Sequence, residues 1–307
     1  MGSVRDGFNV VTGAFGYIGN YIARRLVAEG KNVKTLTNHP GRPNPFGRQI
    51  CVAPLAFDDF ESLAHSMVGA RVLFNTYWVR FEHGGATFTQ AVADTKYLIR
   101  AAEHAGVRRI VHVSIANPSL DSPLPYYRGK SDVEDAIRGS RLTYAILRPT
   151  VVFGPEDILI NNIAWMLRRF PTFAVPGGGN YRVQPVFVED LAALAVAASE
   201  RHENEIFDAV GPETLSFDEL VRRIAAAIGR PARLIHVSSR LSLLLTRLIG
   251  LAVGDVVLTR EEIDGLLANL LVSHEPPSGT TRFTEWLKNN GAHLGRKYTS
   301  ELRRHYR

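Results

Sequence analysis

The sequence predicts an α/β protein that combines a doubly wound parallel sheet with a smaller C-terminal α/β domain. Three observations indicate this fold class. Apolar runs alternate with helical patterns from Phe8 to Arg148, which is the order of parallel strands joined by crossover helices. A glycine-rich turn follows the first apolar run. The 307 residues, 45% hydrophobic and 21% charged, have the composition of a globular protein and suit one large or two joined domains.

The glycine-rich turn has the sequence TGAFGYIG and covers residues 12–19. Gly13 permits a tight turn, Gly16 lets the backbone approach a ligand, and Gly19 lets the following helix pack closely against the strand. The order of strand, glycine turn and helix suits the diphosphate of a dinucleotide, which binds at the positive N-terminus of the helix. The sequence therefore predicts a Rossmann-like domain that binds a dinucleotide.

The second predicted strand covers residues 32–37, and the loop that follows it indicates which dinucleotide is bound. A side chain that contacts the adenosine ribose is expected here. The chain has Asn38 and His39 at this position, with Arg42 nearby and no carboxylate. A carboxylate would accept hydrogen bonds from the ribose hydroxyls and repel a 2′-phosphate, so its absence favours NADP(H) over NAD(H).

The remaining strands and helices continue the alternation. Strands are predicted at 49–52, 71–75, 109–114 and 141–148, and helices at 58–68, 86–103 and 125–138. Ligands of such sheets lie beyond the carboxyl ends of the strands, so Asn75 and Thr76 are predicted to line the cofactor cleft. Tyr77 and Trp78 follow directly and fit either a cleft wall that contacts the substrate or ordinary packing.

A second group of residues suggests proton transfer. Tyr126 and Lys130 are four residues apart in a predicted helix and therefore share a face. A lysine ammonium near a phenol favours the phenolate, and such a tyrosine can exchange a proton with a carbonyl or alcohol. Ser114, at the end of a predicted strand, is placed to hydrogen-bond the same substrate oxygen. This spacing also occurs on ordinary helix surfaces, but the upstream glycine turn and Ser114 favour catalysis, with Tyr127 as the second candidate phenol.

Five segments together resemble the short-chain dehydrogenase/reductase superfamily, of the extended or atypical type. They are TGAFGYIG (12–19), VHVSIAN (111–117), PYYRGK (125–130), LRPTVVFGP (147–155) and QPVFVEDLA (184–192). The segments 75–85 and 161–171 are similar to a bacterial group of NAD(P)-binding epimerase/dehydratase-like proteins. That group is akin to the Rossmann-type accessory subunit of respiratory complex I.

The resemblance implies an NAD(P)(H)-dependent oxidoreductase or epimerase-type enzyme that acts on a carbonyl or alcohol. It implies Ser114, Tyr126 and Lys130 as the catalytic set, with Lys130 also binding the nicotinamide ribose. It implies further cofactor contacts from Gly13, Phe15, Gly16, Tyr17, Ile18, Gly19, Pro149 and Val152. The aspartate with which many members contact adenine has no clear match, because only Ala56 or Asp58 occupies the region.

Two alternative functions stay open at this point. Several relatives have lost catalysis and keep the nucleotide as a structural or sensing ligand, so a non-catalytic sensor or assembly protein is one alternative. The other is a nucleotide-sugar epimerase or dehydratase. Dehydratases carry an acid and a base beside the tyrosine, and this chain offers only Asp121 in a loop.

The domain boundaries follow from the same segments. We expect residues 1–155 to form the nucleotide-binding domain, completed by about 184–210. Residues 156–183 and 211–307 then form the smaller substrate domain. Asn161 and Asn162, with Trp165, are candidates for the substrate wall, although the two asparagines fit a helix cap equally well. A capping box at Ser216 and Glu219 marks a helix start in this domain.

Charge and cysteine content restrict the partners. The net charge is +6, of which residues 296–307 supply +4, and no basic face is interleaved with aromatic residues, so no nucleic-acid binding is expected. The ten histidines show no metal-ligand spacing. The single cysteine, Cys51, excludes an intramolecular disulfide, lies in an apolar run where burial is expected, and fits a reducing compartment. With no signal peptide expected before the first strand, the cytoplasm is predicted.

The sequence also bears on membrane contact and self-association. The longest apolar stretch, 241–258, is interrupted by Arg247 and Asp255, so no membrane span is expected. It is predicted to be a helix packed in the second domain, with peripheral membrane-surface contact as the alternative. A small-molecule substrate is the expected partner, and helices such as 86–103 and 125–138 form homodimer interfaces in much of the superfamily.

Overall fold

The computed structural model describes residues 7–306 and divides the chain into two compact units. Unit 1 runs to Arg148 and includes Leu191–Phe207. Unit 2 consists of Pro149–Asp190 and the chain from Asp208 onward. Each unit has a hydrophobic core of its own.

Unit 1 is built on a seven-stranded sheet in the order β11-β6-β5-β4-β1-β2-β3. Its strands are β1 (Phe8–Thr12), β2 (Val33–Thr37), β3 (Ile50–Pro54), β4 (Ala70–Asn75), β5 (Arg109–Val113), β6 (Thr143–Pro149) and β11 (Glu205–Ala209). Every pairing from β3 across to β6 is parallel. The strand order reverses its direction between β1 and β4, which is the point where doubly wound sheets bind nucleotides. The predicted fold class is confirmed.

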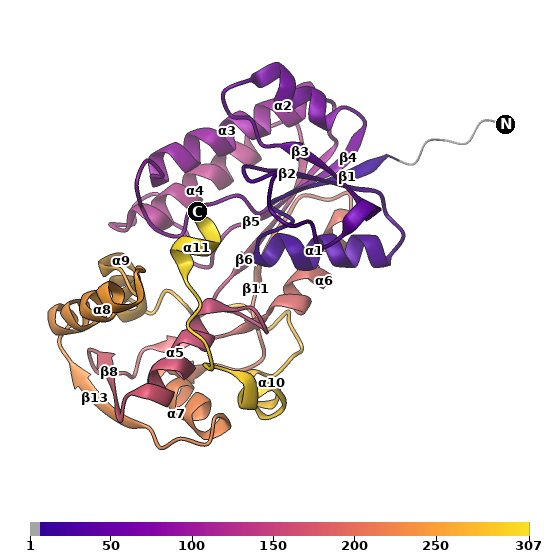
Figure 1. Cartoon of the computed structure of the whole chain (residues 1–307). Helices are drawn as coiled ribbons and strands as arrows, with labels where there is room; N and C mark the ends of the chain where they lie inside the picture. Colours follow the sequence, from indigo (N-terminus) through magenta and orange to yellow (C-terminus); the bar gives the residue numbers. More distant parts are fainter. Residues whose placement is uncertain (1–6, 307) are drawn as a thin grey trace. The chain divides into compact units, whose positions relative to one another are not determined.

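Five helices cover the sheet of unit 1. They are α1 (Tyr17–Ala28), α2 (Phe60–Met67), α3 (Phe88–His104), α4 (Pro125–Arg138) and α6 (Val188–Ser199). Figure 1 shows α2, α3 and α4 on one face of the sheet and α1 and α6 on the other. Leu63, Leu98 and Val133 lie in one apolar cluster with strand residues Leu73 and Ile110, all almost completely buried. Burial of each such side chain contributes about 1.5–3 kcal/mol and fixes the helices against the strands.

Unit 2 contains short paired strands and helices. The strands are β7 (Val152–Phe153), β8 (Thr172–Pro176), β9 (Arg182–Val183), β10 (Val186–Phe187), β12 (Leu215–Ser216) and β13 (Arg233–Val237). The helices are α5 (Ile158–Arg169), α7 (Phe217–Ala227), α8 (Ser239–Val253), α9 (Arg260–Leu267), α10 (Phe283–Asn290) and α11 (Glu301–His305). Short 3₁₀ turns occur at Gly47–Gln49 in unit 1 and Gly291–His293 in unit 2. Phe153 packs against Phe283 and Trp286 in the unit 2 core, and the predicted capping box of Ser216 and Glu219 begins α7.

Two local predictions are wrong for tertiary reasons. Cys51 is exposed rather than buried, because β3 is the edge strand of the sheet and has little packed against it. The apolar stretch 241–258 is not one helix. α8 ends at Gly254, which takes the left-handed conformation at the C-cap (φ 65°), and glycine adopts this conformation without the steric cost of a side chain.

Candidate functional site

The glycine turn at the end of β1 has the geometry that a close-approaching ligand requires. Gly13 has a left-handed backbone (φ 68°), and its carbonyl accepts a hydrogen bond from Gly16 N at 2.8 Å. A Cβ on Gly19 would lie 2.4 Å from Gly13 O, so only glycine fits where α1 crosses the turn. The backbone at Gly13 and Gly19 fits the tight turn and the close helix packing predicted for them, and the approach of a ligand at Gly16 stays a prediction.

The N-terminus of α1 fits a diphosphate. Gly16 is the N-cap residue and supplies no side-chain cap, so the amides of the first helical turn remain available for an anion. Phe15, Tyr17 and Ile18 are all half-buried around this turn. The site therefore combines backbone donors, a positive helix end and apolar walls, which suits a dinucleotide.

A first prediction tests this cradle. Gly19→Ala is expected to destabilise the protein by about 3 kcal/mol, because the new methyl group meets backbone rather than a mobile side chain. It is also expected to lower NAD(P)H affinity at least tenfold, roughly the loss of one charge-assisted hydrogen bond. Gly85→Ala is the matched control, since nothing lies within 4 Å of its added Cβ. Fluorescence titration and urea unfolding measure both effects, and a Gly19→Ala protein that behaves like the control contradicts the assignment.

Hydrogen bonds tie the ends of β1, β4 and β5 together. Thr76 donates from its amide to Thr12 Oγ1 (2.8 Å) and from its hydroxyl to Thr12 O (2.6 Å). Asn75 is completely buried and its amide nitrogen lies 3.1 Å from His112 Nδ1. Burial, aided by the charge of Lys130, holds the pKa of His112 well below its ordinary value, so the imidazole is neutral. Thr76 is half-buried beside the glycine turn, whereas Asn75 holds the strands in position.

The loop after β2 lies at the same sheet edge as the glycine turn, because β1 and β2 are parallel neighbours. Asn38 is exposed, whereas His39 and Arg42 are half-buried. Arg42 N donates to His39 O at 3.1 Å, so these residues form one turn. Burial lowers the pKa of the Arg42 guanidinium, which nevertheless stays charged at neutral pH.

Lys130 and Tyr126 both contact Trp78. The Lys130 ammonium donates to Val113 O at 3.0 Å and lies 4.5 Å from the centre of the Trp78 ring. The half-buried Tyr126 ring meets Trp78 edge-on with centroids 5.9 Å apart. Trp78 Nε1 is buried and has no hydrogen-bond partner among residues 7–306. A buried donor without a partner is unusual and marks a place where a polar ligand atom fits.

The electrostatics of Lys130 differ from the simple expectation of a full positive charge. Its side chain is only 3% exposed. Burial lowers the pKa of Lys130 to about 7, and the carboxylate of Glu134, one helical turn away, opposes this shift. Because this pKa lies near neutrality, the charge of Lys130 responds to whatever binds beside it.

Ser114 makes a contact that the sequence analysis missed. Its hydroxyl donates to Glu134 Oε1 at 2.5 Å. Glu134 is 2% exposed and is held by Arg148, whose Nε and Nη2 lie 3.1 and 2.5 Å from its two oxygens. The spacing of Lys130 and Glu134 on one face of α4 was a signal for this residue. To donate to a substrate oxygen, the hydroxyl has to leave Glu134, because it has one proton to donate.

Comparison with known protein families finds a match to the segment that contains most of these residues. The sequence model of a protein family described as NAD(P)H-binding matches residues 13–157. The matched segment contains the glycine turn, the loop of Arg42 and the Tyr126–Lys130 helix.

Relatives that match about two thirds or more of the chain agree with the predicted resemblance to extended short-chain dehydrogenase/reductases, which is confirmed. Subunit 9 of the NADH dehydrogenase [ubiquinone] 1 alpha subcomplex from Arabidopsis thaliana mitochondria is 29% identical over 68% of this chain and 55% of its own length. A ceramide reductase from Caulobacter vibrioides is 27% identical over 77% of this chain and 75% of its own. The chain thus spans little more than half of the first relative.

A solved structure extends the likeness of fold to unit 2. Triphenylmethane reductase from Citrobacter sp., crystallised with NADP(H), has a TM-score of 0.77 over 92% of this chain and 99% of its own, at 20% identity. At this identity the likeness concerns the fold. The segments of both units thus share the fold of that reductase.

Five predicted site residues lie in unit 2, near or after the end of the matched segment 13–157. They are Pro149, Val152, Asn161, Asn162 and Trp165. Pro149 is buried and Val152 half-buried. Asn161 donates to Lys297 O and accepts from Gly295 N, and Asn162 exchanges two hydrogen bonds with the backbone of Thr299. The alternative that these asparagines cap α5 is wrong, since Asp157 is its N-cap. Substrate contact by Asn161 or Asn162 stays a prediction, and a substrate has to compete with these hydrogen bonds. Substrate contact by Trp165, which is buried, also stays a prediction.

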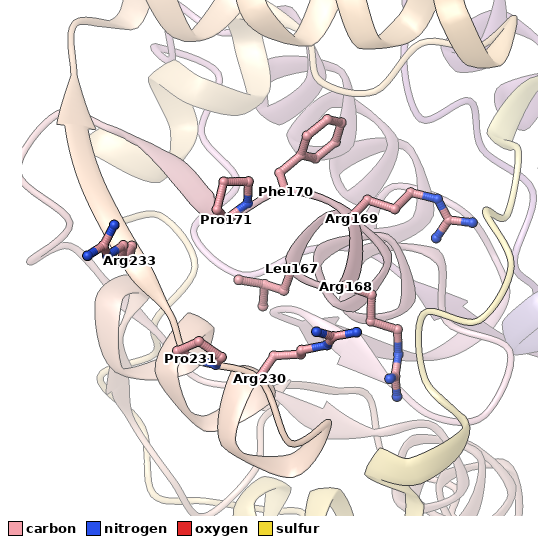
Figure 2. Close-up of a pocket in the computed structure, with 8 residues that line it drawn as sticks. All are labelled: Leu167, Arg168, Arg169, Phe170, Pro171, Arg230, Pro231 and Arg233. Carbon is pink, nitrogen blue, oxygen red and sulfur yellow. The ribbon is translucent and has the colours of Figure 1, made fainter.

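A separate cavity of about 430 Å³ lies in unit 2, and its lining residues are drawn in Figure 2. It is lined by Leu167, Arg168, Arg169, Phe170, Pro171, Arg230, Pro231 and Arg233, and by none of the predicted site residues. Arg168 donates to Leu294 O at 2.7 Å. Arg168, Arg169 and Arg230 stand at or just beyond the carboxyl ends of α5 and α7, where positive charge offsets the helix dipoles, and Arg233 begins β13. We interpret this cluster as structural. Among residues 7–306, no group of three or more His, Cys, Asp or Glu side chains is arranged to hold a metal ion.

Proposed function

We propose that this protein is an NAD(P)H-dependent oxidoreductase that acts on a carbonyl or alcohol group of a small molecule. The observation that carries the proposal is the buried ammonium of Lys130, held against Val113 O and Trp78 one helical turn from Tyr126. Burying a lysine is costly, and a lysine whose pKa falls to about 7 is typical of a functional site. The ceramide reductase relative and the reductase fold support the same reaction class.

Each residue then has a definite role. The bound nicotinamide supplies hydride to the substrate carbon or accepts it. In the reductive direction Tyr126 gives its proton to the carbonyl oxygen, and the resulting phenolate takes up a proton from solvent. Lys130 stabilises the phenolate when protonated, and Ser114 donates to the same oxygen once it has left Glu134. The Trp78 indole forms the wall beside them.

The proposed cofactor is NADP(H), bound through Arg42 and His39. Replacing Arg42 with Ala is expected to lower NADPH affinity about tenfold or more, the value of a hydrogen bond to a charged group. NADH affinity should change less than about twofold, because NADH lacks the 2′-phosphate. Arg48→Ala, which removes an exposed arginine from the same loop region, is the control. Nicotinamide fluorescence titration measures all three proteins, and equal losses for both nucleotides contradict the NADP(H) assignment.

A non-catalytic NAD(P)-binding sensor or assembly protein is the second candidate. The Ser114 hydroxyl is already engaged by Glu134, and Glu134 by Arg148. One relative is by name a subunit of NADH dehydrogenase rather than a reductase. A screen of carbonyl, quinone and nucleotide-sugar compounds with NADPH separates the candidates. Tight NADPH binding without turnover favours the second candidate, and turnover removes it.

The proposal also includes the cellular compartment and the oligomeric state of the protein. A single cysteine, exposed on β3, suits a reducing compartment, and we place the protein in the cytoplasm. We also propose a homodimer formed through α3 and α4. Light scattering of the purified protein tests the dimer, and a monomer at all concentrations rejects it.

A further inference from the structure

Helix α8 presents its leucines outward. The exposed fractions are 43% for Leu241, 54% for Leu244, 56% for Leu248 and 81% for Leu251. Their spacings of three, four and three residues place them on one face. The two buried residues of α8 are instead Ser242 and Gly250. A surface helix ordinarily buries its apolar face, whereas α8 leaves four of its six leucines exposed on one face, with Leu243 and Leu245 half-buried.

The inward face and the ends of α8 explain how it is held without these leucines. Ser238 caps its N-terminus, and Gly254 ends it in a left-handed conformation. A Cβ on Gly250 would lie 2.6 Å from Asp255 O, so the chain packs closely there because the side chain is absent. Figure 1 shows α8 beside α9 at the margin of unit 2. The four leucines are therefore available to a partner.

The charge along this face indicates what that partner is. Arg240 and Arg247 are exposed and lie in one row with Leu244 and Leu251, at spacings of four, three and four. Neither arginine forms an ion pair within the described part of the chain. The helix 239–253 contains no acidic residue. Asp255, just beyond it, is buried and accepts hydrogen bonds from the backbone of Glu301 and Leu302.

We propose that α8 docks this protein on the surface of a bilayer that contains anionic phospholipids. The leucines enter the boundary between headgroups and acyl chains, and the two arginines reach the phosphates beside them. With 15 residues α8 is shorter than the roughly 20 that a span requires. No helix in residues 7–306 has the length and apolarity to cross a membrane. A second copy of the chain fits less well, since a two-fold contact between α8 faces brings four arginines together with no acidic residue of α8 to pair with them.

Flotation with vesicles tests this proposal. Wild-type protein is expected to float with phosphatidylcholine–phosphatidylglycerol vesicles and to bind pure phosphatidylcholine much more weakly. Replacing Leu244, Leu248 and Leu251 together with Ser should lower binding at least about tenfold. Replacing Arg240 and Arg247 with Gln should lower it about fivefold per arginine. Arg230→Gln with Arg233→Gln is the matched control, because it removes two exposed arginines of unit 2 outside α8.

Three outcomes overturn the proposal. These are no binding of wild-type protein to the anionic vesicles, equal losses in the control, and a dimer that the leucine substitutions dissociate without any vesicle binding. Circular dichroism and NADPH titration of each variant show that it is folded. Because the cradle for NAD(P)H lies in unit 1 and α8 in unit 2, vesicle binding and the proposed oxidoreductase function succeed or fail separately.

Discussion

Replacing Tyr126 with Phe is expected to lower turnover by about 10²–10⁴-fold, the usual contribution of a positioned general acid. NADPH affinity should change little, because the ring and its contacts with Trp78 and Phe88 are kept. Only the hydroxyl that gives its proton to the substrate oxygen is removed. Steady-state oxidation of NADPH, with the best substrate from the screen, measures the first effect and fluorescence titration the second.

Tyr127→Phe is the matched control for this prediction. Tyr127 is the neighbouring phenol, three residues from Lys130 on the same helix, but it is 6% exposed whereas Tyr126 is half-buried. The control is expected to retain turnover within a few-fold. If Tyr127→Phe loses turnover and Tyr126→Phe does not, the assignment of the acid has to be exchanged. If neither changes turnover, the proton comes from elsewhere.

Replacing Lys130 with Met is expected to abolish most turnover and to stabilise the protein. The pKa shift from 10.5 to about 7 by itself corresponds to roughly 5 kcal/mol of unfavourable burial. The variant also loses the hydrogen bond to Val113 O and the contact of the charge with Trp78. We therefore expect the free energy of unfolding at pH 7 to rise by an amount on the order of 2 kcal/mol. Such a trade of stability against activity is typical of functional residues.

The pH dependence of folding stability provides a second test of the charge state of Lys130. Between its folded pKa of about 7 and its ordinary value of 10.5, the unfolded chain holds the proton that the folded protein has lost. Folding stability of the wild type therefore rises with pH across this window, and the advantage of the Met variant shrinks. Below the folded pKa the advantage is full and constant.

Urea unfolding near both ends of that window checks the Lys130 prediction. Lys96→Met is the control, because Lys96 is a half-exposed lysine paired with Asp132 and its removal should change stability by about 0.5 kcal/mol or less. An advantage of Lys130→Met that grows with pH, or a loss of stability at pH 7, contradicts the assigned charge state. Lost stability together with retained turnover indicates a purely structural lysine.

The sequence by itself determined the features that depend on local pattern. Gly13 and Gly19 identified the tight turn between β1 and α1, because positive φ and a 2.4 Å approach to Gly13 O tolerate no side chain at these points. Apolar periodicity placed helix 125–138 at the bounds that α4 has in the structure, and with it the common face of Tyr126 and Lys130. Each of these features depends on residues that lie close together in the sequence, so it can be predicted without knowing the fold.

Only the tertiary structure decided contacts between distant segments. Ser114 bonds Glu134, and Arg148 pairs with the same carboxylate, because β5, α4 and β6 pack together, and no local pattern predicts these contacts. Exposure is decided in the same way. Cys51 lies in an apolar run and is exposed because β3 is an edge strand, and the leucines of α8 face outward because Ser242 and Gly250 occupy its buried side. Burial is a property of what packs against a segment, and a segment's own composition does not contain it.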